Sequence, residues 1–186
     1  MRKTLLIVFL FATVVYSQGI DNLAPKSGTD MGLKNIGIRG GLSIPYAKYA
    51  PGFATNLMAD FGTIIPKLSL ALELEYMKAD ESDPKEGISP VKLTVIGGAV
   101  KGLFRPEVDW EVKPYIGAGL GVNVILRDYP RETSDEDSSE PAYFQPRVEL
   151  GADYKLNEDF TANFSTRAVL SNPSFSTILI GIRYNI

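Results

Sequence analysis

The stretch LSLALELEYM, residues 68–77, alternates apolar residues with small or acidic ones without interruption. Successive side chains of a strand point to opposite faces, so Leu72 and Leu74 face one way and Glu73 and Glu75 the other. The stretch therefore predicts a strand with one apolar and one polar face. Alternation alone does not say which face meets water, because a soluble barrel with an apolar interior and a membrane barrel with an apolar exterior both produce it.

Composition narrows the functional classes. At 186 residues the chain is long enough for one domain or one closed barrel. Its net charge is -3 and its Lys and Arg residues form no cluster, so we expect no nucleic-acid partner. The chain has no Cys and no His, which excludes thiol nucleophiles, the usual zinc sites and Ser-His relays. We therefore expect a non-enzymatic protein without a cofactor or a bound metal.

The N-terminus, MRKTLLIVFLFATVVYSQG, has the features of an export signal. Two basic residues precede an apolar run from Leu5 to Tyr16, which is shorter than the ~20 residues of a membrane-spanning helix. We predict a signal peptide over residues 1–17, cleaved after Ser17; a buried N-terminal helix fits the charged start and the small-residue end less well. Residues 18–34 lack periodicity and predict a flexible periplasmic segment.

Between residues 35 and 186 the period-2 pattern recurs eight times, in segments near the ~9 to 11 residues that cross a bilayer when tilted. The predicted strands lie within 35–45, 53–61, 68–77, 91–100, 114–126, 144–154, 160–170 and 177–186. The connections after the first, third, fifth and seventh segments are polar, which predicts that they face the cell exterior while both termini face the periplasm. These exterior connections are 46–52, 80–89, 127–142 and 171–176.

Three features favour a membrane barrel. The aromatic residues, apart from Phe164, fall at strand ends or in connections, where membrane barrels carry aromatic girdles. Glycines such as Gly119 and Gly121 occupy the polar face and fit a narrow, crowded lumen. The polar face also carries five basic and five acidic residues, as a confined interior that pairs its ions requires. The predicted lumen charge network is Arg39, Asp60, Glu73, Glu75, Lys92, Arg147, Glu149, Asp153, Arg167 and Arg183.

Glu73 and Glu75 also suggest an alternative, because two carboxylates on one strand face can serve acid and base catalysis. No histidine, nucleophile or metal ligand accompanies them, so ion pairing with lumen arginines is the better interpretation.

The C-terminal GIRYNI places Gly181, Tyr184 and Ile186 at the spacing of the terminal strand by which outer-membrane barrels are recognised for insertion. With the glycine-rich KPYIGAGLGVNV, it resembles the small outer-membrane β-barrel domain family of bacteria, OmpA-like and OmpX-like barrels included, over residues 35–186. The resemblance implies an all-β, eight-stranded antiparallel up-and-down transmembrane barrel. It also implies contact with outer-membrane lipid and insertion by the barrel-assembly machinery through the C-terminal strand. An aromatic residue is usual at the final position, where this chain has isoleucine.

We therefore expect a monomeric outer-membrane protein whose lumen is filled with side chains and whose extracellular loops serve envelope integrity or a surface interaction. The loop at 127–142 is the longest and most acidic, and is the strongest candidate to contact a partner, whose identity the sequence does not reveal. Two alternatives stay open, a small porin-like channel and a soluble periplasmic carrier of an apolar ligand. The aromatic positions favour the membrane barrel over the carrier.

Overall fold

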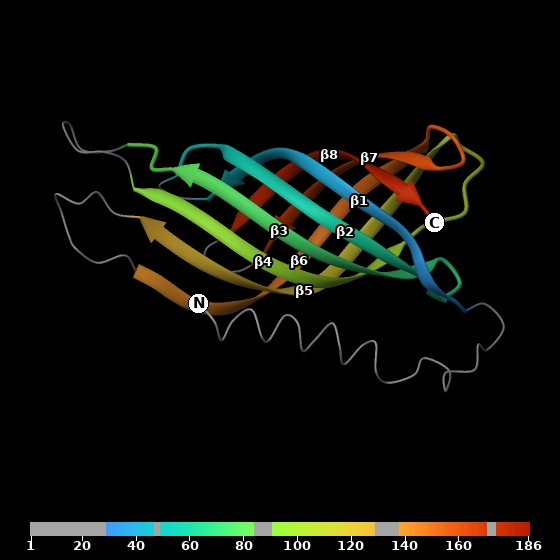
Figure 1. Ribbon diagram of the computed structural model, residues 1–186, viewed down its shortest axis with the longest axis horizontal. Helices are drawn as coiled ribbons and strands as arrows, with labels where there is room; N and C mark the ends of the chain where they lie inside the picture. The colour runs from blue at the N-terminus through green and yellow to red at the C-terminus, as the bar shows by residue number, and fades with distance from the viewer. Residues whose placement is uncertain (1–28, 47–48, 84–90, 129–137, 171–173) are drawn as a thin grey trace.

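The computed structural model describes residues 29–46, 49–83, 91–128, 138–170 and 174–186, and shows one closed barrel (Figure 1). Each strand pairs antiparallel with its neighbours in the chain, and β8 returns to pair with β1. This confirms the predicted all-β, eight-stranded up-and-down barrel. The strands are β1 (Asp30–Pro45), β2 (Gly52–Ile65), β3 (Leu68–Asp80), β4 (Lys92–Phe104), β5 (Val112–Asp128), β6 (Ser138–Lys155), β7 (Phe160–Val169) and β8 (Phe175–Asn185).

The connections divide between the two ends of the barrel. The C-terminus lies at the same end as the β2–β3 and β6–β7 turns (Figure 1); we call this the turn end and the opposite end the loop end. At the β6–β7 turn, the Asn157 side-chain oxygen accepts hydrogen bonds from the backbone N–H groups of Asp159 (3.0 Å) and Phe160 (2.8 Å). This local bonding shapes the turn, and Asn185 at the end of β8 adds a hydrogen bond from its side-chain amide to the Glu158 backbone oxygen at 2.9 Å. In the described part of the chain, no helix has the length and hydropathy needed to cross a bilayer.

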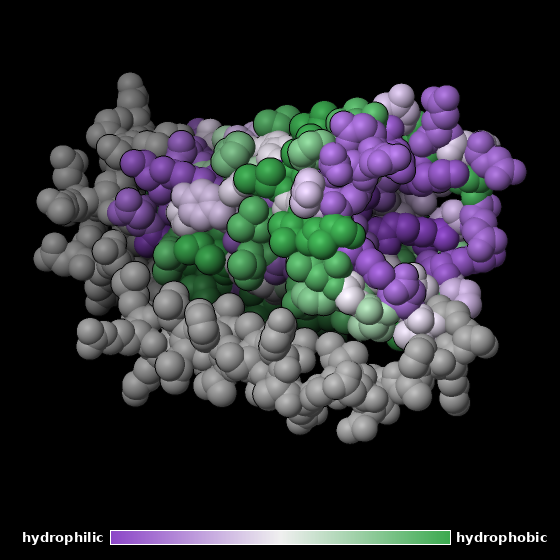
Figure 2. All heavy atoms as spheres, turned by 45° about the vertical axis from the view of Figure 1, so that its right-hand side comes forward, coloured by the Kyte–Doolittle hydropathy of each residue, from purple (hydrophilic) through white to green (hydrophobic). Residues whose placement is uncertain are grey.

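The two faces of the wall differ in chemistry. On β3, Glu73 is 3% exposed while its neighbour Leu74 is 52% exposed, and this alternation recurs around the barrel. A single closed sheet has only an inside and an outside, so the buried polar residues line the lumen and the apolar residues form the outer wall. Figure 2 shows the apolar side chains gathered across the middle of the visible face, with hydrophilic residues toward the ends. LSLALELEYM therefore presents its leucines to the outside.

The predicted faces of the fourth strand are wrong. The sequence pattern places Lys92 and Ile96 in the lumen and Leu93 and Val95 outside, but the structure buries Leu93 and Val95 and leaves Lys92 and Ile96 exposed. β4 pairs with β3 and with β5 without a register shift, and this pairing determines which residues of β4 face the lumen. The inward-facing positions follow every second residue from Leu93 to Lys101. Apolar residues also line the lumen near the loop end, so hydropathy does not identify the inner face there.

Most strands extend past their predicted ends, β2 and β4 by four residues each at their C-terminal ends, and the starts of β1 and β6 differ most from those predicted. β1 begins at Asp30, before the expected start of the barrel at residue 35, and its register with β2 shifts between Met31 and Asn35. β6 begins at Ser138, inside the predicted loop 127–142. The signal peptide, residues 18–28 of the flexible segment, and residues 47–48, 84–90, 129–137 and 171–173 of the predicted loops lie outside the described residues.

Adjacent glycines on β1 provide a matched test of how closely β1 and β8 pack. A Cβ at Gly41 would overlap the backbone carbonyl oxygen of Ile178 on β8, whereas at Gly40 the nearest atom lies 3.9 Å away in the Phe53 ring. We expect Gly41→Ala to lower the free energy of unfolding by about 1–3 kcal/mol, the usual cost of overpacking, because the strands must separate. Gly40→Ala should stay near wild type. Urea titration of both variants, refolded in detergent, compares them, and equal midpoints would contradict the close approach.

Candidate functional site in the barrel lumen

Two buried carboxylates, Glu73 on β3 and Glu149 on β6, hold the centre of the lumen. Arg39 on β1 pairs with Glu73, and its NH1 lies 2.5 Å from the Glu149 Oε1. Lys101 on β4 bridges the same two carboxylates, with its Nζ 2.6 Å from the Glu73 Oε1. Each cation is thus shared by two acids from different strands, which ties four strands together across the lumen.

A third carboxylate, Glu75, extends these pairs toward the loop end. Arg147 NH2 lies 2.9 Å from the Glu75 Oε1, and Arg167 NH2 lies 2.6 Å from the Glu75 Oε2. Arg167 also contacts Glu73, with NH1 3.1 Å from the Glu73 Oε2. The ion pairs are therefore continuous. We call this set the central network: Arg39, Glu73, Glu75, Lys101, Arg147, Glu149 and Arg167.

Neutral side chains complete the hydrogen bonding of the central network. Arg39 Nε donates to the Asn56 Oδ1 at 2.9 Å, and Tyr115 donates its hydroxyl to the Glu149 Oε1 at 2.9 Å. Asn163 in turn donates to the Tyr115 hydroxyl oxygen at 3.0 Å. Buried ions need such additional partners, because pairing alone seldom offsets their loss of hydration.

A second set of ion pairs lies toward the turn end. Arg105 NH2 lies 2.7 Å from the Asp60 Oδ2, and Arg105 Nε lies 3.7 Å from the Asp153 Oδ2. Arg183 also contacts Asp153. We call these four residues the mouth network, because the Arg105 side chain is 27% exposed while the central network is buried.

The loop end of the lumen is apolar. Six inward-facing residues with at most 2% exposure pack together there, and Tyr49 and Tyr143 pack against them. We call this cluster the apolar plug: Met77, Leu93, Val95, Ile125, Val169 and Phe175. From the turn end to the loop end, the lumen is therefore filled by the mouth network, the central network and the apolar plug.

The structure brings together nine of the ten residues predicted for the lumen charge network, and leaves out Lys92. Lys92 is exposed at the beginning of β4, level with Asp80 and Asp128 in the register. Among the described residues, the lysine in the lumen is Lys101, which continues the alternation that runs through Leu93. The prediction missed it because the predicted strand ended at residue 100, whereas β4 continues to Phe104. Arg105 was missed as well, because it follows the end of β4 and alternation gives no direction for it.

The predicted C-terminal signal residues occupy both faces of β8. Gly181 lies opposite Arg39 on β1, and a Cβ at Gly181 would overlap the Ile38 carbonyl oxygen. Tyr184 faces outward, with its ring centroid 5.6 Å from that of Phe160. Ile186 is exposed at the end of the chain. Their role in insertion stays a prediction.

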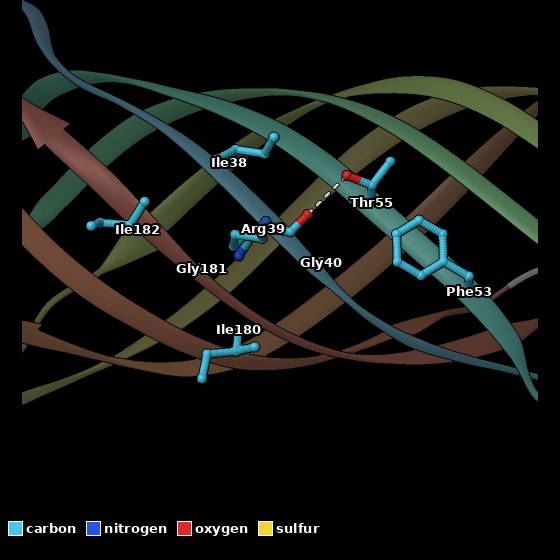
Figure 3. Close-up of a pocket in the computed structure, with 8 residues that line it drawn as sticks. All are labelled: Ile38, Arg39, Gly40, Phe53, Thr55, Ile180, Gly181 and Ile182. Carbon is cyan, nitrogen blue, oxygen red and sulfur yellow. Dashed lines mark hydrogen bonds between the residues drawn. The ribbon is translucent and has the colours of Figure 1, made fainter.

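A depression of about 530 Å³ lies on the outer wall, over β8, β1 and β2 around Gly40 (Figure 3). Its side chains are apolar except those of Arg39, which points into the lumen, and Thr55, whose hydroxyl donates to the Arg39 backbone oxygen at 3.1 Å. It therefore offers no unsatisfied polar side chain to a ligand. Among the described residues, no group of three Asp, Glu, His or Cys side chains is placed to hold a metal ion.

The chain matches the family model described as the outer membrane protein beta-barrel domain over residues 4–185. No curated protein matches it. Neisserial surface protein A has a similar structure, with a TM-score of 0.60 and 19% identity over 82% of this chain and 96% of that one. OprG from Pseudomonas aeruginosa gives 0.59 and 14%, covering 86% and 99%. The attachment invasion locus protein Ail of Yersinia pestis gives 0.57 and 12%, covering 84% and 100%. At these identities the likeness to solved structures concerns the fold.

The two lysines of β4 test the corrected phase of this strand. In Lys101→Met, the Glu149 Oε2 loses the cation that contacts it, so we expect the free energy of unfolding to fall by about 3 kcal/mol or more. Lys92→Met, made on the same strand and exposed, should change it by about 0.5 kcal/mol or less. Urea titration in detergent measures the free energy of unfolding of both variants. A greater decrease in Lys92→Met than in Lys101→Met would show that Lys92 faces the lumen, as the sequence pattern predicted.

Proposed function

The chain belongs to the outer membrane protein beta-barrel domain family, and we propose that it is a non-enzymatic outer-membrane barrel, exported by the signal peptide at residues 1–17. Its closed lumen holds the barrel together and conducts nothing, while its extracellular loops serve envelope integrity or contact a partner at the cell surface. The observation that carries this proposal is the filling of the lumen by two ion-pair networks and an apolar plug.

The filled lumen argues against a porin-like channel. An eight-stranded barrel is only wide enough for its own side chains, and water-filled channels appear at about 16 strands. In the central network, Arg39 and Lys101 reach across the lumen to carboxylates on other strands. The apolar plug adds a dry section in series with these charges, and apolar constrictions stop ions by excluding water.

The outer wall argues against a soluble carrier of an apolar ligand. Phe144 is 79% exposed and Ile180 is 68% exposed, and every strand contributes apolar residues to the same surface. Soluble proteins rarely expose so extensive an apolar surface, whereas a bilayer covers it. The lumen centre is filled with charged groups, so an apolar ligand would lack a matching environment there.

The surroundings of Glu73 and Glu75 support a non-enzymatic role. Both carboxylates are less than 6% exposed, and Arg39, Lys101 and Arg167 contact Glu73. A general acid or base must reach its substrate, and these groups are surrounded by permanent partners. We therefore assign the pair to the stability of the barrel.

The proposal also names the contacts of the barrel. Outer-membrane lipid covers the apolar wall, and the barrel-assembly machinery recognises the terminal strand through Gly181, Tyr184 and Ile186. The barrel acts as a monomer. The surface partner, of unknown identity, binds the connection between β5 and β6, within the predicted loop 127–142.

In planar bilayers we expect the purified protein to be silent, because no continuous water path crosses the central network and the plug. Conductance at fixed voltage is the measurement, and co-flotation of the protein with liposomes shows that it has inserted. Reproducible steps of nanosiemens size from inserted protein would reject the closed lumen in favour of a porin.

Single cysteines test the orientation, since the chain has none of its own. Asp83 is exposed after β3 at the loop end, and Glu158 is exposed in the β6–β7 turn at the opposite end. On intact cells, an impermeant thiol reagent should label Asp83→Cys and leave Glu158→Cys unlabelled until the outer membrane is permeabilised. The reverse pattern would show that the loop end faces the periplasm, and recovery of the protein in a soluble fraction would favour the carrier.

A further inference from the structure

We propose that the lumen binds one halide-sized monovalent anion beside Arg147, between the central network and the apolar plug. This site is distinct from the loops and from any conducting path. Two observations carry it: a group of buried donors without acceptors, and an excess of positive charge in the central network.

Of the nine buried side-chain polar atoms without hydrogen-bond partners among the described residues, three belong to Asn35 and Arg183, one is the Glu75 Oε2, which forms an ion pair with Arg167, and five gather on one side of the lumen. Their four side chains are at most 3% exposed. Four of the five atoms are N–H donors and the fifth is a hydroxyl, which can also donate. Buried donors almost always have an acceptor, so a group of them points to a ligand that accepts. The atoms are Arg147 Nε, Arg147 NH1, Arg167 Nε, Gln145 Nε2 and Thr177 Oγ1.

The strand register places these donors in one neighbourhood. Gln145 and Arg147 are two residues apart on the inner face of β6, and Arg167 lies directly opposite Thr177 on β8. Arg147 and Arg167 also hold the two oxygens of the same Glu75 carboxylate. The NH2 of Arg147 is used by Glu75 and by Asn123, at 2.9 and 3.2 Å, which leaves its Nε and NH1 for another acceptor.

The charge of the central network has the sign that an anion requires. Among the described residues it joins four cations to three carboxylates, which leaves one positive charge in excess. In the mouth network two cations meet two carboxylates, so it does not supply the missing charge. An uncompensated charge away from water is costly, and one monovalent anion would make the central network neutral.

The surroundings select a small anion. In the register Val169 lies between Arg147 and Phe175, so the apolar plug borders the site on its loop-end side. The dianionic form of phosphate would carry more charge than the network lacks, and the side-chain-filled lumen favours a halide over the larger phosphate. Chloride is the probe we choose for solution measurements, and bromide for crystallography.

The first experiment measures the urea unfolding midpoint of the protein in detergent, in mixtures of sodium chloride and sodium gluconate at constant ionic strength. A ligand that binds only the folded state raises the free energy of unfolding. Once the ligand concentration exceeds the dissociation constant, this increase is proportional to the logarithm of the concentration. We expect the wild-type midpoint to rise in this way with chloride. A midpoint that is the same in both salts would overturn the proposal, because water alone would then satisfy the donors.

Gln145→Glu places the missing negative charge in the site itself. Gln145 accepts a hydrogen bond from Asn123 through its Oε1, which a carboxylate retains, while the new oxygen replaces the unpartnered Nε2. We expect this variant to have a higher midpoint than wild type in gluconate and to lose its response to chloride. A response as large as that of wild type would place any bound halide elsewhere and refute this site.

Asn163→Asp is the matched control, because it makes the same change in the lumen beside an existing acid. Asn163 donates to the Asp153 Oδ1 at 2.7 Å, so a carboxylate there meets a like charge. Asn163 also accepts from the Arg39 NH1 at 3.4 Å, but Glu73 and Glu149 already pair with that arginine. The urea midpoint of this variant should be lower than that of wild type in both salts, and it should still rise with chloride.

If Gln145→Glu does not fold, crystals of the wild-type protein grown in bromide test the site instead. An anomalous peak beside Arg147 supports the site, and a lumen without one rejects it.

Discussion

The constraint on which this barrel depends is that charges held away from water must find their partners inside a narrow lumen. Glu73 and Glu149 meet it by sharing Arg39 and Lys101, so that β1, β3, β4 and β6 are joined through the interior as well as around the wall. Breaking one such pair strands a buried ion, which costs far more than the pair contributes when intact. The network also disfavours alternative registers, since a strand shifted by one residue would turn its ions outward.

Glycines make room for these long side chains. On β5, a Cβ at Gly119 would meet the Lys101 side chain, and a Cβ at Gly121 would overlap the Arg147 guanidinium. The wall beside Lys101 and Arg147 is thus reduced to backbone, which makes room in a barrel of eight strands for a buried ion network. Glycine weakens an isolated strand, but here it is required by the packing of other residues.

The lumen also changes chemistry along its axis. Its centre is ionic, whereas the loop end is closed by apolar residues such as Val95 and Ile125. These inward-facing side chains are of the same apolar type as those that cover the outer wall. Conduction would require the ion pairs to separate and the plug to become hydrated, so two barriers of different physical origin lie in series.

The sequence by itself determined the number of strands, their order and the inner face of seven of them, because period-2 alternation and polar connections are local properties of the chain. It also identified nine of the charged lumen residues. Only the tertiary structure decided the phase of β4, where Leu93 and Val95 face inward and Lys101 takes the place expected for Lys92. When both faces of a strand carry apolar residues, the hydropathy pattern does not show which face points into the lumen. The register with the neighbouring strands then determines it. The ion-pair partners within the network are also determined only by the tertiary structure. Arg39 and Glu149, for example, lie 110 positions apart in the sequence and come into contact only when the barrel closes.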